Sequence, residues 1–129
     1  MVTKQKAREV TLRWVEAVNS RDIKLIDQVA DKMFTADYVY HLPGAQDFPP
    51  GPASMKQLFR WVLAENPDFN STLEDLFVEG DKAASRYTMR RKDPTTGKPQ
   101  HATTLMINRY LGDKAAEDWE LVGPWEDDV

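Results

Sequence analysis

The chain has 129 residues, with 17 lysines and arginines against 21 aspartates and glutamates, so its formal net charge is −4. This length and a hydrophobic content of 41% suit one domain with a substantial core, so we expect residues 1–129 to form a single domain. The sequence contains no cysteine, which excludes a disulfide scaffold, a thiolate zinc site, an iron–sulfur cluster and a cysteine nucleophile.

The charge balance and the hydropathy pattern argue against further classes of protein. A nucleic-acid-binding surface needs clustered positive charge, and the excess of acids argues against one. The sequence holds no run of 18 apolar residues for a membrane span, and Glu9 and Arg13 interrupt the apolar run that a signal peptide needs. We therefore expect a cytoplasmic protein that binds neither nucleic acid nor membranes.

The N-terminal part of the chain shows two helical patterns and then one short strand. Apolar residues recur at helical spacing over 7–18 and again over 25–33. Asp22 is a suitable N-cap for the second helix. Residues 37–41 contain Tyr, Val and Tyr in succession, which favours a strand.

A loop rich in proline and glycine, residues 43–52, precedes a third helical pattern. Pro52 suits the first turn of this helix, and Pro67 follows its end. After residue 68 the helical period disappears, and short turns separate four expected strands: 69–79, 82–92, 99–111 and 115–122. Strands joined by such short turns are antiparallel. The whole pattern predicts an α+β fold with its helices on one face of the sheet.

The last expected strand carries carboxylates on both of its faces. Alternation divides it into one face with Glu117, Trp119 and Leu121, and another with Asp118 and Glu120. Amphipathicity alone would bury Trp119 and Leu121 and leave Asp118 and Glu120 in water. If helices cover one face and a partner subunit the other, Glu120 instead lies in an apolar cavity. Desolvation would then raise its pKa and suit it to proton transfer.

A histidine and a set of bulky side chains are further candidates for a pocket. His41 shares a strand face with Val39, opposite Tyr38 and Tyr40, and it precedes a loop, where reactive residues are common. A hydrogen-bonded structural histidine is the alternative. The bulky residues are either core or the walls of a pocket for a flat apolar ligand: Trp14, Phe59, Trp61, Tyr87, Met89 and Met106.

Four basic residues gather near the end of one strand: Arg86, Arg90, Arg91 and Lys92. They form either a solvated face or a contact for an anion such as a carboxylate.

The order of the elements and several short strings resemble the SnoaL-like polyketide cyclases of the nuclear transport factor 2-like superfamily. The strings are RWVEAVN at 13–19, DYVYHLP at 37–43, PGP at 50–52, PDF at 67–69, EDL at 74–76, EGD at 79–81 and EDWE at 117–120. Together they span nearly the whole chain. The resemblance implies a curved antiparallel sheet wrapped around three N-terminal helices, which forms a cone with an internal cavity.

The same resemblance implies a cofactor-free, metal-free enzyme of the lyase or isomerase class. Such a cyclase or isomerase would transfer a proton on a small, apolar, carbonyl-containing substrate. Glu120 matches the family's acid/base on the last strand, although a shift of one residue would put Leu121 there. His41 matches a histidine of the first strand and would polarise the carbonyl or share the proton relay. The expected substrate-binding residues are Trp14, Phe59, Tyr87, Met89, Met106 and Asp118.

A non-catalytic module of the same fold, binding a hydrophobic ligand or another protein, is the alternative. The reason is that Trp14 and Met106 stand where the related ketosteroid isomerases carry oxyanion donors, and neither can donate as required. In either case we expect a homodimer through the outer face of the sheet, with Trp119 and the side of Arg86 and Arg90 taking part.

Overall fold

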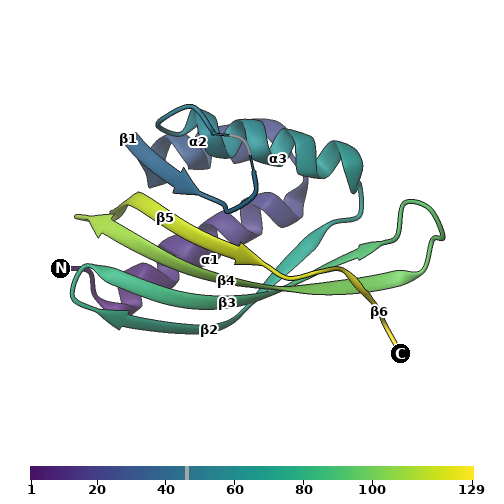
Figure 1. Ribbon diagram of the computed structural model, residues 1–129. Helices are drawn as coiled ribbons and strands as arrows, with labels where there is room; N and C mark the ends of the chain where they lie inside the picture. The colour runs from purple at the N-terminus through teal and green to yellow at the C-terminus, as the bar shows by residue number, and fades with distance from the viewer. Residues whose placement is uncertain (46) are drawn as a thin grey trace.

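The computed structural model describes residues 1–45 and 47–129. Three helices, α1 (Lys4–Ser20), α2 (Ile23–Met33) and α3 (Ala53–Glu65), cover one face of a curved sheet (Figure 1). The strands are β1 (Phe34–His41), β2 (Asn70–Glu79), β3 (Lys82–Lys92), β4 (Pro99–Leu111), β5 (Lys114–Val122) and β6 (Glu126–Asp127). The predicted α+β architecture, with a sheet curved around three helices, is confirmed.

The helices begin where the local chemistry predicts. Thr3 caps α1 by accepting from the backbone nitrogen of Lys6 at 3.0 Å. The Asp22 carboxylate accepts from the first backbone N–H groups of α2, which confirms it as the N-cap. Pro52 directly precedes α3 with a helical φ of −57°, so its missing N–H leaves no donor unpaired.

The sheet is mixed and not wholly antiparallel as expected, because β1 runs parallel to β5; the strand order is β1-β5-β4-β3-β2, with β6 paired with β4. β2 to β5 form the expected antiparallel meander. β1 is longer than expected, and it pairs in parallel with β5, so that Tyr40 is the partner of Asp118 and His41 that of Trp119. This pairing joins segments far apart in the sequence and sets Tyr38 and Tyr40 beside the acids of β5.

The helix-covered face of the sheet is the one that carries Asp118 and Glu120. Asp118 is 3% exposed, whereas Trp119 is 38% and Leu121 61% exposed. The prediction from amphipathicity alone, which buried Trp119 and Leu121, is therefore wrong. The helices supply the apolar stripes that cover the inner face, whereas the outer-face side chains of Leu105, Ile107, Trp119 and Leu121 are exposed.

Two hydrophobic clusters of the core meet around two aromatic side chains, and a third surrounds Ala7 and Tyr110. One cluster surrounds Tyr38 and Met55, and a second surrounds Ile26. Trp14 and Phe59 pack against both, in an edge-to-face pair with ring centroids 5.4 Å apart. In the part of the chain that the structure describes, no helix is long and apolar enough to cross a membrane.

Candidate functional site

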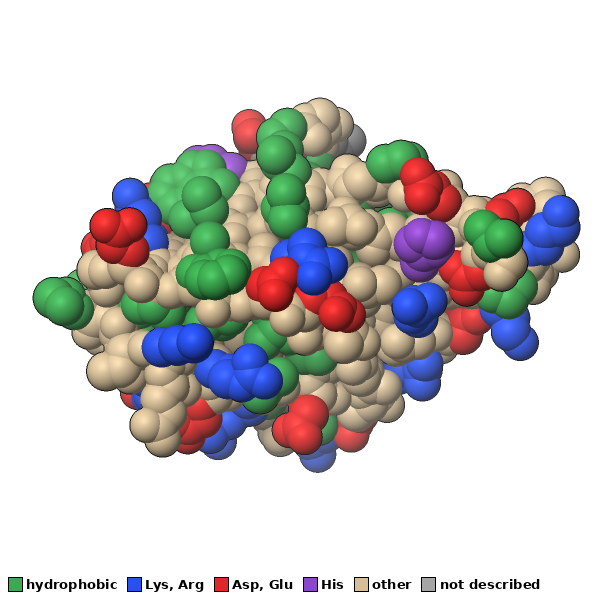
Figure 2. All heavy atoms as spheres, turned by 90° about the horizontal axis from the view of Figure 1, so that it is seen from below, with side chains coloured by type: hydrophobic (Ala, Val, Ile, Leu, Met, Phe, Trp, Pro, Cys, Tyr) green, Lys and Arg blue, Asp and Glu red, His purple; other side chains and the backbone are tan. Residues whose placement is uncertain are grey.

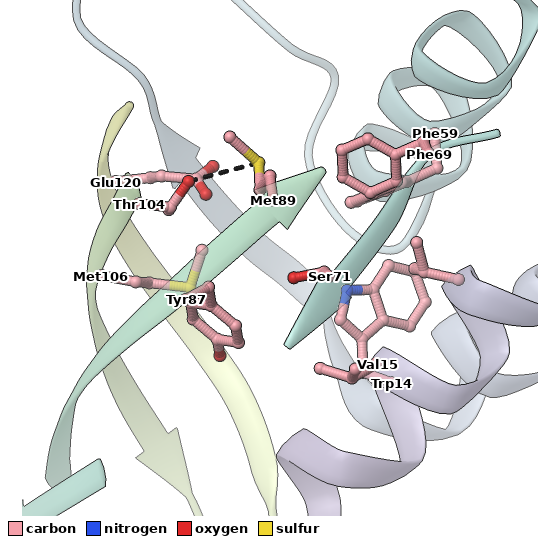
Figure 3. A pocket seen from close by; sticks show the side chains of 11 residues that line it. Trp14, Val15, Phe59, Phe69, Ser71, Tyr87, Met89, Thr104, Met106 and Glu120 are labelled. Carbon is pink, nitrogen blue, oxygen red and sulfur yellow. Dashed lines mark hydrogen bonds between the residues drawn. The ribbon is translucent and has the colours of Figure 1, made fainter. Parts of the chain in front are cut away.

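Two small chambers lie between the sheet and the helices. Their volumes are about 60 and 50 Å³, and each is large enough for a few water molecules. Five residues line both: Trp14, Phe59, Tyr87, Met106 and Glu120. Figure 3 shows Glu120 and Met106 on the sheet side, facing Trp14 and Phe59 on the helices. The chambers are therefore a largely apolar space with one carboxyl group in their shared wall.

A wider pocket of about 390 Å³, here called the mouth pocket, adjoins these chambers. Its lining includes Phe59 and Trp61 of α3, Arg91 of β3 and Trp125 of the C-terminal segment. This volume lies in the range that holds small organic molecules. Glu120 also lines the mouth pocket, so its carboxyl group lies where the inner chambers meet the pocket.

The environment of Glu120 suits it to exchange a proton near neutral pH. Burial among apolar side chains raises its pKa from 4.5 to about 7, and the charge of Asp118 acts in the same direction. A hydrogen bond from the Tyr40 hydroxyl to Oε1 of Glu120 opposes this rise but does not cancel it. A carboxyl group with this pKa is present in both its acid and its base form at neutral pH.

Asp118 forms a second, deeper polar group beside Glu120. The Tyr38 hydroxyl donates to its Oδ2 and the Asn108 amide nitrogen to its Oδ1, both at 2.5 Å. Burial outweighs these two hydrogen bonds and raises the pKa of Asp118 from 3.8 to about 6. Burial also raises the pKa values of Tyr38 and Tyr40, so both phenols remain protonated donors.

The structure does not bring His41 to these two acids. Its side chain lies on the outer face of the sheet, where Nε2 is 2.7 Å from Oε2 of Glu117. The imidazole stacks on Trp119, with ring centroids 5.5 Å apart and an interplanar angle of 15°. The reason is the strand alternation: Tyr38 and Tyr40 face the helices, so His41 faces outward. A role for His41 in proton transfer stays a prediction.

The other expected site residues gather around the chambers. All six expected substrate-binding residues line at least one of them: Trp14, Phe59, Tyr87, Met89, Met106 and Asp118. Of the two roles that the sequence allowed for Trp61, the one in the core is wrong, because its side chain is 63% exposed. Trp61 lines the mouth pocket. Leu121 points outward, so Glu120 is the residue of the pair that faces the cavity.

The sequence interpretation missed the direct partners of the two acids: Tyr38, Tyr40 and Asn108. The sequence signal for them was that Tyr38 and Tyr40 share a strand face opposite His41. Once β1 is known to pair with β5, this shared face places both tyrosines beside Asp118 and Glu120. In the described part of the chain, no three His, Asp or Glu side chains gather as metal ligands would.

Comparison with known proteins agrees with this fold. Residues 11–118 match the family profile of the SnoaL-like domain, so the chain belongs to the SnoaL-like family. No curated protein matches it significantly in sequence. Its structure is similar to that of IdmH from Streptomyces antibioticus, a candidate polyketide cyclase, with 26% identity and a TM-score of 0.75 over 89% of this chain and 90% of that one.

Two further solved structures resemble the chain at lower sequence identity. A candidate polyketide cyclase from Acidithiobacillus ferrooxidans is 20% identical, with a TM-score of 0.78 over 95% of this chain and 91% of that one. AclR from Streptomyces galilaeus, a candidate hydroxylase, is 21% identical, with a TM-score of 0.75 over 94% and 81%. These two support the nuclear transport factor 2-like cone fold, while the different activities suggested for them show that the fold does not define one reaction.

Proposed function

We propose that the protein is a cofactor-independent enzyme that transfers a proton on a flat, apolar, carbonyl-containing small molecule, as a cyclase or an isomerase does. The observation that carries this proposal is the position of Glu120. Its carboxyl group has a pKa of about 7, lines both inner chambers and also lines the mouth pocket. A carboxylate that is shielded from water and close to a bound ketone is a competent base toward the acidic C–H next to the carbonyl.

The neighbours of Glu120 support this role. The ionised Glu120 takes the proton from carbon, and the resulting neutral acid returns it to the same or another atom of the substrate. The hydrogen bond from Tyr40 orients the carboxyl group through both steps. Asp118, with its lower pKa of about 6, is the more ionised of the two acids at pH 7 and raises the pKa of Glu120 by repulsion.

Exchange of carbon-bound hydrogen for deuterium tests the proposal without knowledge of the natural substrate. The probe is 2-tetralone, a flat bicyclic ketone with acidic C–H groups, followed by NMR in D₂O. The wild-type protein should accelerate the exchange over buffer, and Glu120→Gln should remove the acceleration. Glu117→Gln is the matched control, because Glu117 lies on the same strand but pairs with His41 and Arg109 on the outer face.

A non-catalytic module that binds a hydrophobic ligand is the second candidate function. The small volumes of the two inner chambers favour it, because Trp14, Phe59 and Met106 fill much of the space that a substrate would need. Binding of 2-tetralone without accelerated exchange, equal in wild type and Glu120→Gln, would support this function against the enzymatic one.

We also propose that the protein forms a homodimer through the outer face of the sheet. One row of paired residues crosses four strands there and is mostly apolar: Phe77, Ala84, Ile107 and Trp119. Leu105 and Leu121 pair in the adjacent row, and both are exposed. Figure 2, which views the sheet from the side opposite the helices, shows hydrophobic side chains among charged ones on this face.

The charges on this face favour a second copy as the partner. Arg86 is paired with Asp75 at 2.7 Å, and Arg109 with Glu117 at 3.3 Å. These two arginines are therefore balanced within the chain, whereas Lys82, whose Nζ lies 6.0 Å from the centroid of the Trp119 ring, forms no ion pair among the described residues. A contiguous apolar surface whose bordering charges are mostly paired is typical of protein–protein contacts, and it can meet its own copy with little like-charge repulsion.

A further inference from the structure

The three arginines of β3 differ in whether they have a carboxylate partner. Arg86 Nε lies 2.7 Å from Asp75 Oδ2, and Arg90 Nη1 lies 3.8 Å from Asp128 Oδ2. Among the described residues, Arg91 has no carboxylate oxygen within 4.0 Å of its guanidinium group. Arg91 is the one of the three that lines the mouth pocket. Its charge is therefore left without a direct counter-ion at the wall of a pocket.

Neutral groups hold the Arg91 side chain in place. Its Nε donates to Oε1 of Gln100 at 3.0 Å, and its Nη1 donates to Oδ1 of Asn66 at 3.1 Å. The guanidinium carbon lies 4.3 Å from the centroid of the Trp125 ring. These contacts fix the orientation of the guanidinium without neutralising it, and they use two of its five N–H donors.

The Gln100 amide stands between Arg91 and two nearby carboxylates. Gln100 receives the hydrogen bond from Arg91, and its own amide nitrogen donates to Oδ1 of Asp127 at 2.8 Å and to Oδ2 of Asp93 at 3.4 Å. The pKa of Asp93 is lowered mainly by the hydrogen bond from the Thr95 backbone and only slightly by the charge of Arg91, and no ion pair joins Asp93 to Arg91. Glu65 also lines the mouth pocket, but it is exposed to water, which screens its charge.

Arg91 and Glu120 lie apart along the sheet, since Glu120 pairs with Met106 and Met106 pairs with Ser85, six residues before Arg91 on β3. Arg91 and Trp125 form one part of its lining, and Glu120 forms the part that adjoins the apolar inner chambers. An anion is attracted to Arg91 and repelled by the ionised form of Glu120. A ligand with one acidic and one apolar end therefore has one favoured orientation, with its acidic end at Arg91.

We propose that Arg91 binds a carboxylate group on the ligand of this protein, so that its substrate class is flat apolar carbonyl compounds that carry a free acid at one end. The guanidinium offers the paired N–H geometry that a carboxylate accepts, and Trp61 and Trp125 supply aromatic surface beside it. The inference rests on the proposed function in taking the mouth pocket as the place of the substrate. It adds the group that selects and orients that substrate.

A pair of isosteric probes tests the carboxylate site by binding alone. 2-Naphthoate and 2-acetonaphthone have the same shape, but the first is an anion and the second a neutral ketone. Binding is measured at pH 6, where Glu120 is mostly protonated, from the NMR shifts of the Trp61 and Trp125 indole N–H groups. The wild-type protein should bind the naphthoate roughly tenfold more tightly than the ketone, as expected for a hydrogen bond to a charged group.

Variants separate the carboxylate site from a structural effect of Arg91. Arg91→Gln should abolish the preference for naphthoate and leave the affinity for the ketone unchanged, whereas Arg91→Lys should keep part of the preference. Arg90→Gln is the matched control and should keep all of it, since Arg90 pairs with Asp128 instead. A preference that survives in Arg91→Gln, or an equal loss of both ligands, would overturn the proposal.

Glu120→Gln distinguishes this inference from the proposed function. The variant should retain the preference for naphthoate, because Arg91 is intact. If the preference depends on Arg91 while tetralone exchange does not depend on Glu120, the carboxylate site stands and the enzymatic proposal fails. Absence of any preference in the wild-type protein would refute the carboxylate site, whatever the exchange experiment shows.

Discussion

The hydroxyl of Tyr40 donates a hydrogen bond to the carboxyl group of Glu120, although the two residues lie 80 positions apart in the chain. The parallel pairing of β1 with β5 brings them together on the helix-covered face of the sheet. Burial raises the pKa of Tyr40, so its hydroxyl keeps its proton and can donate throughout the neutral range. Because this donation stabilises the ionised carboxylate, Tyr40 limits the rise of the pKa of Glu120.

Tyr40→Phe should therefore raise the pKa of Glu120 above its value of about 7. A hydrogen bond to a charged group contributes about 1.5–3 kcal/mol, which corresponds to a rise of roughly one to two pH units. Carbon-13 NMR of protein labelled at the glutamate carboxyl carbons measures the titration directly. Tyr38→Phe is the contrasting variant: Tyr38 donates to Asp118, so its loss leaves Asp118 more protonated, weakens the repulsion and should lower the pKa of Glu120 rather than raise it. An unchanged pKa of Glu120 in Tyr40→Phe would show that the hydrogen bond does not act on the carboxylate.

Asp118 should make the folded state less stable as the pH rises. Its pKa is about 6 in the folded protein against 3.8 as an ordinary value, so the folded state binds more protons than the unfolded state between these values. The free energy of unfolding then falls with rising pH. The stability that comes from the proton bound to Asp118 in the folded state is fully present below about pH 4 and is lost by about pH 6 to 7. The shift of roughly two units corresponds to about 3 kcal/mol.

Asp118→Asn removes this contribution and keeps a side chain that can still bind to Tyr38 and Asn108. Urea unfolding at pH 4, 5, 6 and 7 gives the free energy of unfolding of both proteins. Relative to wild type, the variant should gain up to about 3 kcal/mol of stability between pH 4 and pH 7. A difference that stays constant over this range would mean that the folded-state pKa of Asp118 is not raised.

The elements of this fold could be predicted from local sequence patterns, whereas its key pairing could not. Asp22, Pro52 and the turns between the later strands act within a few residues, so the sequence indicates them directly. The pairing of β1 with β5 joins distant segments, and no local pattern specifies such a partner. The burial of Glu120 could not be predicted locally either. Strand alternation places Glu120 on the face opposite Trp119, but which of the two faces is buried depends on where the helices pack.

His41 provides a test of how far the resemblance to the family predicts the site. Its position on the outer face, paired with Glu117 and stacked on Trp119, predicts that His41→Gln leaves the pKa of Glu120 unchanged. Tetralone exchange should also proceed at the wild-type rate. The same NMR titration and exchange measurements check both outcomes. A loss of exchange comparable to that in Glu120→Gln would instead support the catalytic role that the sequence suggests for His41.

Gly51 holds the proline-rich loop against β1, and its replacement should be costly. Its backbone nitrogen donates to the Tyr38 carbonyl at 2.8 Å, and its φ is +79°. A Cβ atom added here would lie 2.6 Å from the carbonyl oxygen of Ala36. Gly51→Ala should therefore destabilise the fold by more than the roughly 1 kcal/mol that a left-handed conformation costs alone.

Gly80→Ala is the matched control for this clash. Gly80 has a similar φ of +64°, but apart from Gly80 itself and its two chain neighbours no atom of the described residues lies within 4 Å of the position that an added Cβ would take. Thermal and urea unfolding of both variants separate the two effects, since the conformational cost is common to both. Equal losses of stability would show that the contact with Ala36 relaxes without cost.

The outer face of the sheet should hold two copies of the chain together. Ile107→Glu places a charge in the middle of the apolar row that Phe77 and Trp119 extend, so it should convert the dimer to a monomer. Sedimentation equilibrium measures the mass directly. Leu25→Glu is the control, because Leu25 is also exposed but lies on α2, away from this face.

A wild-type protein that stays monomeric at concentrations of about 0.1 mM would contradict the proposed assembly, since stable interfaces of this kind have micromolar or lower Kd values. Circular dichroism of Ile107→Glu should show an unchanged fold, because the substituted side chain is partly exposed within one chain.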